Sequence, residues 1–210
     1  KDFFRTLLKN HNILPELMAS KSYNVTKNEI SFDDELYDVD KKKWVRKIQP
    51  PASSQPSYLE AHEHFLKEIF NVAFDEESGF LILTVEHLSP FFANDLLNII
   101  VRELNEEARK VELLEVNETL SFLTQELTKN NTAAIRESIS NLIESQLRSK
   151  MLAYSNEDFL LSYVDPPFIP ERKSKPSRAT ICIAFFVAGL ILSILFVIFR
   201  DAFHTYKKNY

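Results

Sequence analysis

The sequence contains very little glycine and cysteine. Only two of its 210 residues are glycine, Gly79 and Gly189, and only one, Cys182, is cysteine, whereas an average chain has about 7% glycine. Two glycines cannot build the usual nucleotide-binding loops, and the sequence has neither a phosphate-binding glycine loop nor a nucleophile elbow. A single cysteine excludes an intrachain disulfide. The shortage of glycine favours long, uninterrupted helices over a fold built from many tight turns.

The sequence also lacks a pattern of metal-binding or catalytic side chains. His62 and His64 are two residues apart, so on a helix they lie on different faces and are badly placed to bind one metal ion. Acidic pairs such as Glu106–Glu107 are typical of solvated helix surfaces. We therefore predict no catalytic residue, no cofactor and no metal site, and we expect a protein that is not an enzyme.

Acidic and basic residues are unevenly distributed. The chain has 25 Lys and Arg against 30 Asp and Glu, but residues 172–210 hold seven basic residues and a single acidic one, Asp201. The body before them is acidic, which argues against binding to nucleic acid, because nucleic-acid-binding domains carry a basic face. A basic C-terminal end suits a segment that flanks a membrane.

An apolar run near the C-terminus predicts a transmembrane helix. Residues 179–199 carry no charge, and as a helix they would reach about 31 Å, the thickness of the hydrocarbon core of a bilayer. Arg178 and Arg200 bracket the run, and the positive charges on its two flanks are too similar in number to fix its orientation. Small residues predict a face for close helix packing: Ala184, Ala188, Gly189 and Ser193.

Prolines dominate the segment just before this run. Residues 164–178 contain Pro166, Pro167, Pro170 and Pro176. Because proline fixes φ and has no amide hydrogen, the segment is predicted to be a stiff, extended tether that leads into the membrane helix.

Short helices and loops are predicted for the first part of the chain. Apolar residues at helical spacing predict an amphipathic helix of about ten residues, which ends within Asn12–Pro15. Residues 20–56 are polar and predict an irregular region. Ser57 and Glu60 match a capping box and predict the start of a second helix.

Strands are predicted at three places. Residues 72–74 and 80–87, with a turn between them, predict a β-hairpin. The second of these segments is rich in apolar and β-branched residues, as a buried strand should be. Leu160–Val164 predicts a third strand that would pair with it from far along the chain.

The longest feature is a predicted pair of helices over residues 89–154. Ser89–Pro90 is a good helix start, with a capping hydroxyl and a proline at the first helical position, and neither glycine nor proline follows until after Lys129. Asn130–Thr132 then predicts a break before the second helix. An apolar stripe on the first helix predicts a coiled-coil seam or an oligomer interface rather than a ligand site: Leu97, Ile100, Leu104, Val111 and Leu114.

These segments together resemble the Wzz-type polysaccharide chain-length determinants, also called polysaccharide co-polymerases. The likeness rests first on the proline-rich segment Val164–Pro176 ahead of the apolar run. Further support comes from residues 80–98, where a strand leads into a helix, and from Ile143–Leu147 with Met151–Ala153 before the last predicted strand. The likeness covers most of the chain and is weakest over residues 20–56.

The resemblance implies a fold that the residues alone do not. It is an α+β fold with a small membrane-proximal α/β base, a long protruding helical hairpin and a C-terminal transmembrane helix. Residues 1–171 would form a periplasmic domain at the bacterial inner membrane, and residues 200–210 a short cytoplasmic tail. The family has a first transmembrane helix near its N-terminus that this sequence lacks, so a fragment is expected.

The resemblance also implies a function. The family forms homo-oligomeric rings that set the length of lipopolysaccharide O-antigen or a related glycan, without catalysis of their own. The implied partners are further copies of the chain, the O-antigen polymerase, the growing polysaccharide and the membrane. The alternatives are a subunit of a capsule or exopolysaccharide exporter and, more broadly, a membrane-anchored coiled-coil adaptor.

Overall fold

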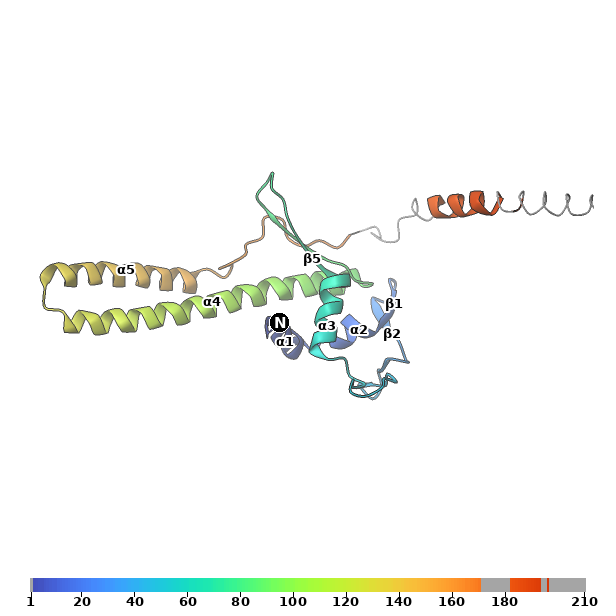
Figure 1. Ribbon diagram of the computed structural model, residues 1–210, viewed down its shortest axis with the longest axis horizontal. Coiled ribbons are helices and arrows are strands. Elements are labelled where there is room, and N and C mark those ends of the chain that lie inside the picture. The colour runs from blue at the N-terminus through green and yellow to red at the C-terminus, as the bar shows by residue number, and fades with distance from the viewer. Residues whose placement is uncertain (1, 171–181, 194–195, 197–210) are drawn as a thin grey trace, which may run out of the picture. The chain divides into compact units, whose positions relative to one another are not determined.

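The computed structural model describes residues 2–170, 182–193 and 196. The chain divides into two compact units, Lys1–Ile169 and Pro170–Tyr210. The helices α1 to α5, the π-helical turn η1 and the strands β1 to β6 all belong to the first unit (Figure 1).

Two short helices open the first unit. α1 spans Asp2–His11 and α2 spans Leu14–Ala19. Asn12 ends α1 with a φ of 47°, a left-handed conformation that asparagine tolerates better than most residues. Pro15 lies in the first turn of α2, where a missing amide hydrogen costs nothing. The predicted amphipathic helix is confirmed, and on one side it buries Phe4, Leu7 and Leu8.

Two small antiparallel hairpins follow, within the region for which the sequence predicts irregular structure. β1 (Ser20–Asn24) pairs with β2 (Glu29–Phe32), and β3 (Tyr37–Asp38) pairs with β4 (Lys43–Trp44). Asn28 supplies a positive φ of 54° in the first turn, a position for which glycine is the usual sequence signal. The prediction of an irregular region was therefore wrong for residues 20–44, where the turns are made without glycine. Residues 45–56 contain no helix or strand, as predicted.

A helix with a π-helical end follows the second small hairpin. α3 spans Tyr58–His64 and continues as η1 over Phe65–Ile69. The Ser57 half of the predicted capping box is confirmed, since Ser57 Oγ accepts a hydrogen bond from the backbone N–H of Glu60 at 3.1 Å. A side-chain oxygen in this place satisfies one of the amide groups that have no partner inside the helix. The Glu60 carboxylate instead pairs with Arg46.

The predicted β-hairpin is also present, but its second strand is not buried as expected, since Leu81 and Ile82 are 48% and 49% exposed. β5 (Phe70–Phe74) pairs in antiparallel register with β6 (Leu81–Val85). Asp75 opens the turn, where its carboxylate accepts hydrogen bonds from the backbone N–H of Glu77 and from the Ser78 hydroxyl. Gly79 has a φ of 72°, a conformation that favours glycine because it has no Cβ.

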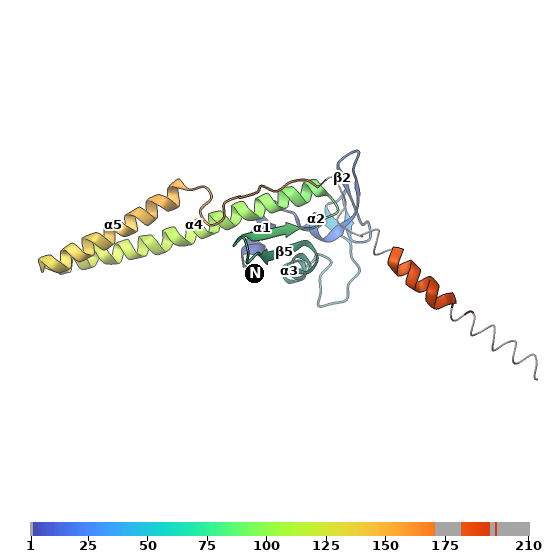
Figure 2. The same cartoon turned by 90° about the horizontal axis from the view of Figure 1, so that it is seen from above.

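A long helical hairpin completes the first unit. α4 spans Pro90–Lys129, and α5, Ala133–Ser155, folds back beside it (Figures 1 and 2). Ser89 caps α4 as predicted, with its Oγ accepting a hydrogen bond from the N–H of Phe92 at 3.2 Å. The outer part of the hairpin buries four residues: Val116, Leu123, Ile139 and Ala153.

The main hydrophobic core lies where the short helices meet the first part of α4. Its buried members are Phe4, Leu7, Leu8, Ile13, Leu14, Leu17, Ala61, Phe65, Ile69, Leu96 and Ile100. A polar contact supports it, because His11 Nε2 on α1 lies 2.7 Å from Glu103 Oε1 on α4. The core therefore fixes the root of α4, while the rest of this helix pairs with α5.

The predicted α+β class with an α/β base is wrong. Within the described residues the strands form three separate two-stranded sheets rather than one layer, and the core is built almost entirely from helices. The predicted third strand, Leu160–Val164, pairs with no strand. Its backbone groups find partners on α4 instead, so it adds nothing to a sheet.

The predicted transmembrane helix at residues 179–199 also needs correction. In the part of the chain that the structure describes, no helix is long and apolar enough to cross a membrane. The helix described in the second unit comprises residues 182–193, whereas a membrane span needs about 20 residues. Residues 179–181, 194–195 and 197–199 of the predicted span lie outside the described residues, as does the predicted tail at 200–210.

Candidate functional site

An extended segment after α5 lies along α4 and is called the strap here, residues 156–168. It contains no helix or strand, and Figure 2 shows it running close to α4. Four α4 side chains hold it by hydrogen bonds to its backbone or side chains: Asn94, Asn98, Asn105 and Arg109. Their spacing of four, seven and four residues places all of them on one side of the helix.

Asn105 makes the central contact with the strap. Its Nδ2 donates to Leu161 O at 2.8 Å, and its Oδ1 accepts from the N–H groups of Leu160 and Leu161, each at 2.7 Å. Only 3% of this residue is exposed. The amide group offers a donor and an acceptor together, so it can pair with both backbone groups of Leu161, as a residue on a neighbouring strand would.

Arg109 holds the beginning of the strap where α5 ends. Its Nη2 donates to the carbonyl oxygens of Asn156 and Glu157 at 2.8 and 2.7 Å. Asn156 is the C-terminal cap residue of α5, so the guanidinium lies where the negative end of the helix dipole favours a cation. Arg109 thereby fastens the end of α5 and the start of the strap to α4.

The far end of the strap is fastened by two asparagines and a tyrosine. Asn94 Nδ2 donates to Pro167 O at 3.1 Å, and the Tyr163 hydroxyl donates to Asn98 Oδ1 at 3.0 Å. Asn98 Nδ2 in turn donates to Asn94 Oδ1 at 2.9 Å, which orients both side chains. The strap is therefore held at both ends and in the middle.

The predicted proline motif falls partly on the strap. Pro166 and Pro167 lie in it, and Pro170 follows in the second unit, all three without helix or strand. Pro176, with the rest of the predicted tether after residue 170, lies outside the described residues. A proline has no N–H to donate but its carbonyl still accepts, and Pro167 is held in that way.

The predicted apolar stripe on α4 divides between two environments. Ile100 is buried in the core, and Leu104 and Leu97 are partly buried. Val111 and Leu114 are instead 54% and 65% exposed. The stripe is thus core in its first part, and only the second part is open to a partner.

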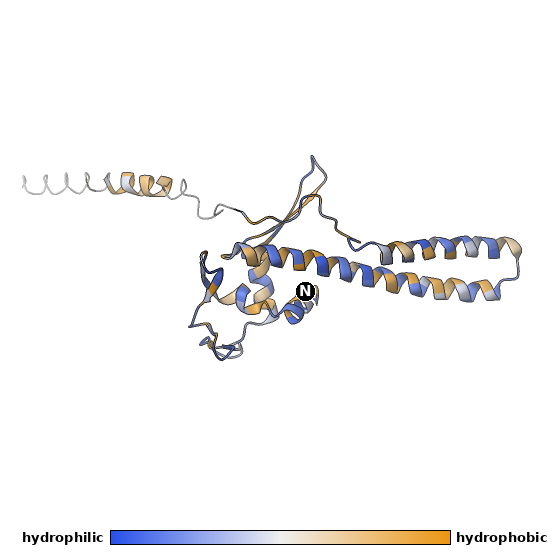
Figure 3. Ribbon diagram, turned by 180° about the vertical axis from the view of Figure 1, so that it is seen from behind, coloured by the Kyte–Doolittle hydropathy of each residue, from blue (hydrophilic) through white to orange (hydrophobic). Residues whose placement is uncertain are grey.

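The exposed part of the stripe lies on one side of the outer half of α4, which it shares with the exposed Glu115 and Glu118. Val111, Leu114 and Phe122 are all exposed, and helical geometry places them on the side of α4 opposite the buried Val116 and Leu123. Figure 3 shows apolar residues on more than one side of the hairpin. Val111, Leu114 and Phe122 together are called the outer face below.

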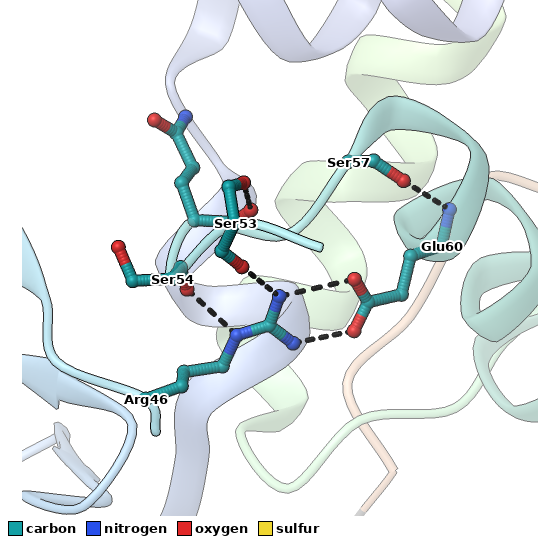
Figure 4. Close-up of polar contacts among 6 residues, drawn as sticks. Arg46, Ser53, Ser54, Ser57 and Glu60 are labelled. Atoms are coloured by element: carbon teal, nitrogen blue, oxygen red, sulfur yellow. Dashed lines mark hydrogen bonds and ion pairs between the residues drawn. The ribbon is translucent and has the colours of Figure 1, made fainter. Parts of the chain in front are cut away.

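A second polar cluster holds the loop before α3 (Figure 4). Arg46 Nε donates to Ser54 O at 2.7 Å, and Nη2 donates to Ser53 O at 3.3 Å. The same guanidinium donates from both Nη atoms to the Glu60 carboxylate. These bonds hold the pKa of Glu60 below its ordinary value, chiefly through the Arg46 side chain. The cluster ties a loop to a helix.

The four small residues of the predicted packing face lie in the second unit. Ala184, Ala188, Gly189 and Ser193 lie on the helix of residues 182–193, and all are exposed. No heavy atom lies within 4 Å of a Cβ built at Gly189, apart from its own helix and chain neighbours. Their role in packing stays a prediction.

Sequence reasoning missed the four residues that hold the strap. Their signal is three asparagines and an arginine at positions 94, 98, 105 and 109 of a helix, an unusual choice because asparagine disfavours helix interiors. In the described part of the chain, no group of three or more His, Cys, Asp or Glu side chains could hold a metal ion.

No protein-family model matches the sequence, and no curated protein is significantly similar to it. The resemblance to the Wzz-type chain-length determinants therefore stays a prediction.

Proposed function

We propose that this chain is a non-catalytic, homo-oligomeric scaffold that regulates polysaccharide chain length in lipopolysaccharide O-antigen biosynthesis, acting with the membrane polymerase. One observation carries the proposal: a long helical hairpin is fixed at its root in a helical core and presents an apolar outer face. That arrangement suits repeated contact between identical subunits, and the sequence resemblance supplies the glycan context.

The outer face supports self-association. Val111, Leu114 and Phe122 are each more than half exposed, and apolar side chains spaced along one side of a helix suit packing against a second helix. Contact between hairpins of neighbouring copies would remove these side chains from water, at about 25 cal/mol for each Å² of apolar area buried. The hairpin is thereby a scaffold element and needs no catalytic residue.

The strap supports the coupling between scaffold and polymerase. It leads from the end of α5 back along α4, past the core, to the proline-rich segment. Because the strap is held at three places, a displacement of the hairpin relative to the core would also displace Pro166 and Pro167. The growing polysaccharide and the polymerase are the partners on which this scaffold acts.

The proposed location is the bacterial inner membrane, with the bulk of the chain on the periplasmic side. This location follows from the proposed partnership with a membrane polymerase. It does not depend on a transmembrane helix at residues 179–199.

The test is expression of the full-length gene in a bacterial host that lacks its own length regulator but has an O-antigen polymerase. The lipopolysaccharide ladder is then resolved on a gel. A random ladder that collapses to a band of preferred length supports chain-length control. An unchanged ladder, with the protein present in the membrane fraction and the polymerase active, contradicts it.

Replacement of Pro166 and Pro167 by alanine tests the coupling by the strap. We expect the preferred band to shift or broaden, because alanine removes the fixed φ and loosens the chain. Val164→Ala in the same exposed segment is the matched control and should leave the band in place. An unchanged band in the double proline variant would refute the coupling role.

The alternatives make different predictions in the same strain. A subunit of a capsule or exopolysaccharide exporter would leave the O-antigen ladder unchanged and alter the amount of surface polysaccharide. A membrane-anchored coiled-coil adaptor would leave both unchanged. The exposed hairpin suits each alternative, and the ladder separates them from chain-length control.

A further inference from the structure

A histidine joins α2 to the first turn of α4 through two hydrogen bonds. His87 Nε2 lies 3.0 Å from Glu16 O on α2, and His87 Nδ1 lies 3.1 Å from the backbone nitrogen of Ser89. The imidazole also packs on Phe92, with the ring centroids 4.5 Å apart. His87 therefore bridges two elements that are 71 residues apart in the chain.

The two partners fix the protonation state of the ring. Glu16 O can only accept, so Nε2 must carry the hydrogen that is donated to it. The Ser89 N–H can only donate, so Nδ1 must be the unprotonated acceptor. The observed contacts are compatible with one form alone, the neutral ring with its hydrogen on Nε2.

Ser89 connects His87 to the long helix α4. It is the cap residue of α4, and its Oγ accepts from the N–H of Phe92 while its carbonyl accepts from the N–H of Ala93. Only 2% of Ser89 is exposed, so its own N–H has no easy alternative partner in water. His87 thus supplies the acceptor that completes the start of α4.

Protonation of His87 would break this arrangement in two ways. A hydrogen on Nδ1 would face the Ser89 N–H, which turns a donor–acceptor pair into two opposed donors. The new positive charge would also lie at the N-terminus of α4, the end of a helix at which a cation is disfavoured. Burial acts in the same direction and lowers the pKa of His87 from its ordinary value.

We propose that His87 is a proton-sensitive latch that holds the root of α4 against α2 while its ring is neutral and releases it when the ring is protonated. The latch is a conformational device and does not rest on the proposed function. Asn94 lies five residues beyond Ser89 and holds the end of the strap. Release of the first turn of α4 therefore also loosens the root to which the strap is fastened.

Three carboxyl groups belong to residues close to the latch contacts in the sequence. Glu16 lies on α2, Glu86 precedes His87, and Asp95 lies in the second turn of α4. A carboxylate that faces the ring would favour its charged form and would therefore oppose the effects of burial and of the two lost contacts. Burial raises the pKa of Glu16, and its Oε2 is buried without a hydrogen-bond partner in the described residues. Glu16→Gln removes this group and isolates the histidine.

The first test is amide hydrogen exchange of the whole chain at pH 7.5, 6.5 and 5.5. The latch predicts that the protection factors of Ser89 and Phe92 fall by up to tenfold for each pH unit below about 6.5. The protection of Leu123, far along α4, should stay constant. Constant protection of Ser89 and Phe92 across this range would overturn the proposal.

Single substitutions test whether His87 causes the pH dependence of amide protection. His87→Gln keeps a donor for Glu16 O but cannot be charged, so the pH dependence at Phe92 should disappear. The matched control His64→Gln should retain it, and Glu16→Gln should strengthen it. Persistence of the pH dependence in a folded His87→Gln variant would contradict the latch.

Nuclear magnetic resonance of the ring nitrogens tests the wild-type chain without any substitution. We expect the hydrogen of His87 on Nε2 alone at pH 7.5 and on both nitrogens at low pH. The loss of protection at Ser89 should follow the same titration curve. A hydrogen on Nδ1 at pH 7.5 would refute the latch, even if the variants failed to fold.

Discussion

Asn105 and Leu161 are joined by a reciprocal pair of hydrogen bonds. Asn105 Nδ2 donates to Leu161 O at 2.8 Å, and the Leu161 N–H donates to Asn105 Oδ1 at 2.7 Å. This exchange is the one that a residue makes with its partner across two strands. It explains how an extended segment can run along a helix without leaving its buried backbone groups unpaired.

Asn105→Leu should destabilise the protein more than any other single change in the strap contacts. The substitution removes three hydrogen bonds and leaves backbone groups of Leu160 and Leu161 without partners, at a cost of about 2–3 kcal/mol. Urea unfolding measures this loss. Asn98→Leu is the matched control, because Asn98 is exposed and its loss should cost less than about 1 kcal/mol. Equal losses in the two variants would contradict the central role of Asn105.

The strap also shows where sequence reasoning succeeds and where it fails. The helix starts at Ser57 and Ser89 and the hairpin of β5 and β6 are local features, so capping residues, a turn signal and strand composition predicted them. Leu160–Val164 has the composition of a strand, but its partner is a side chain 56 residues away. Composition alone cannot reveal such a partner.

Long-range packing also determines which part of the apolar stripe on α4 is buried and which part is exposed. Ile100 and Leu114 belong to the same predicted apolar stripe of α4, yet Ile100 is buried in the core and Leu114 is exposed. The short helices α1 to α3 cover only the root of α4, and nothing in the stripe itself marks where that cover ends. The predicted sheet failed for a related reason, because Leu160–Val164 was expected to pair with the β5–β6 hairpin and its backbone instead meets Asn105 on α4.

Leu114→Lys should reduce self-association without unfolding the chain. A lysine on the outer face would oppose contact between copies, whereas in the monomer the position is 65% exposed and the change should cost less than about 0.5 kcal/mol. Light scattering after size-exclusion chromatography measures the mass. Thr124→Lys, also exposed on α4 but away from the outer face, should associate like the wild type. A loss of association in both variants would argue against this face.

The Arg46–Glu60 pair should make the free energy of unfolding depend on pH in the acidic range. Arg46 lowers the pKa of Glu60 from 4.5, so the stabilisation is present above pH 4.5 and is lost as the pH falls below it. Because 42% of the Glu60 side chain is exposed, screening limits the effect to less than about 1 kcal/mol. Denaturant unfolding of Glu60→Gln should show a flatter profile below pH 4.5 than wild type. A wild-type slope that survives in this variant would point to other carboxylates.

Glu16→Gln should stabilise the protein at neutral pH. Burial raises the pKa of Glu16 from 4.5, so its contribution to stability is greatest below pH 4.5 and is lost as the pH rises through the folded-state pKa. A neutral amide avoids the cost of a buried charge, and we expect a gain of about 1 kcal/mol at pH 7. The gain should vanish near pH 4, as measured by urea unfolding at both pH values. A loss of stability at pH 7 would show that the carboxylate has a partner.

The lipopolysaccharide ladder tests the central claim most directly. Wild-type gene, Leu114→Lys and empty vector are compared in one strain that has a polymerase and no length regulator, with band intensity measured against repeat number. We expect a single preferred length for the wild type, a weakened or shifted preference for Leu114→Lys, and a random ladder for the vector. A wild-type ladder that matches the vector, with the protein present in the membrane fraction, would contradict the central claim.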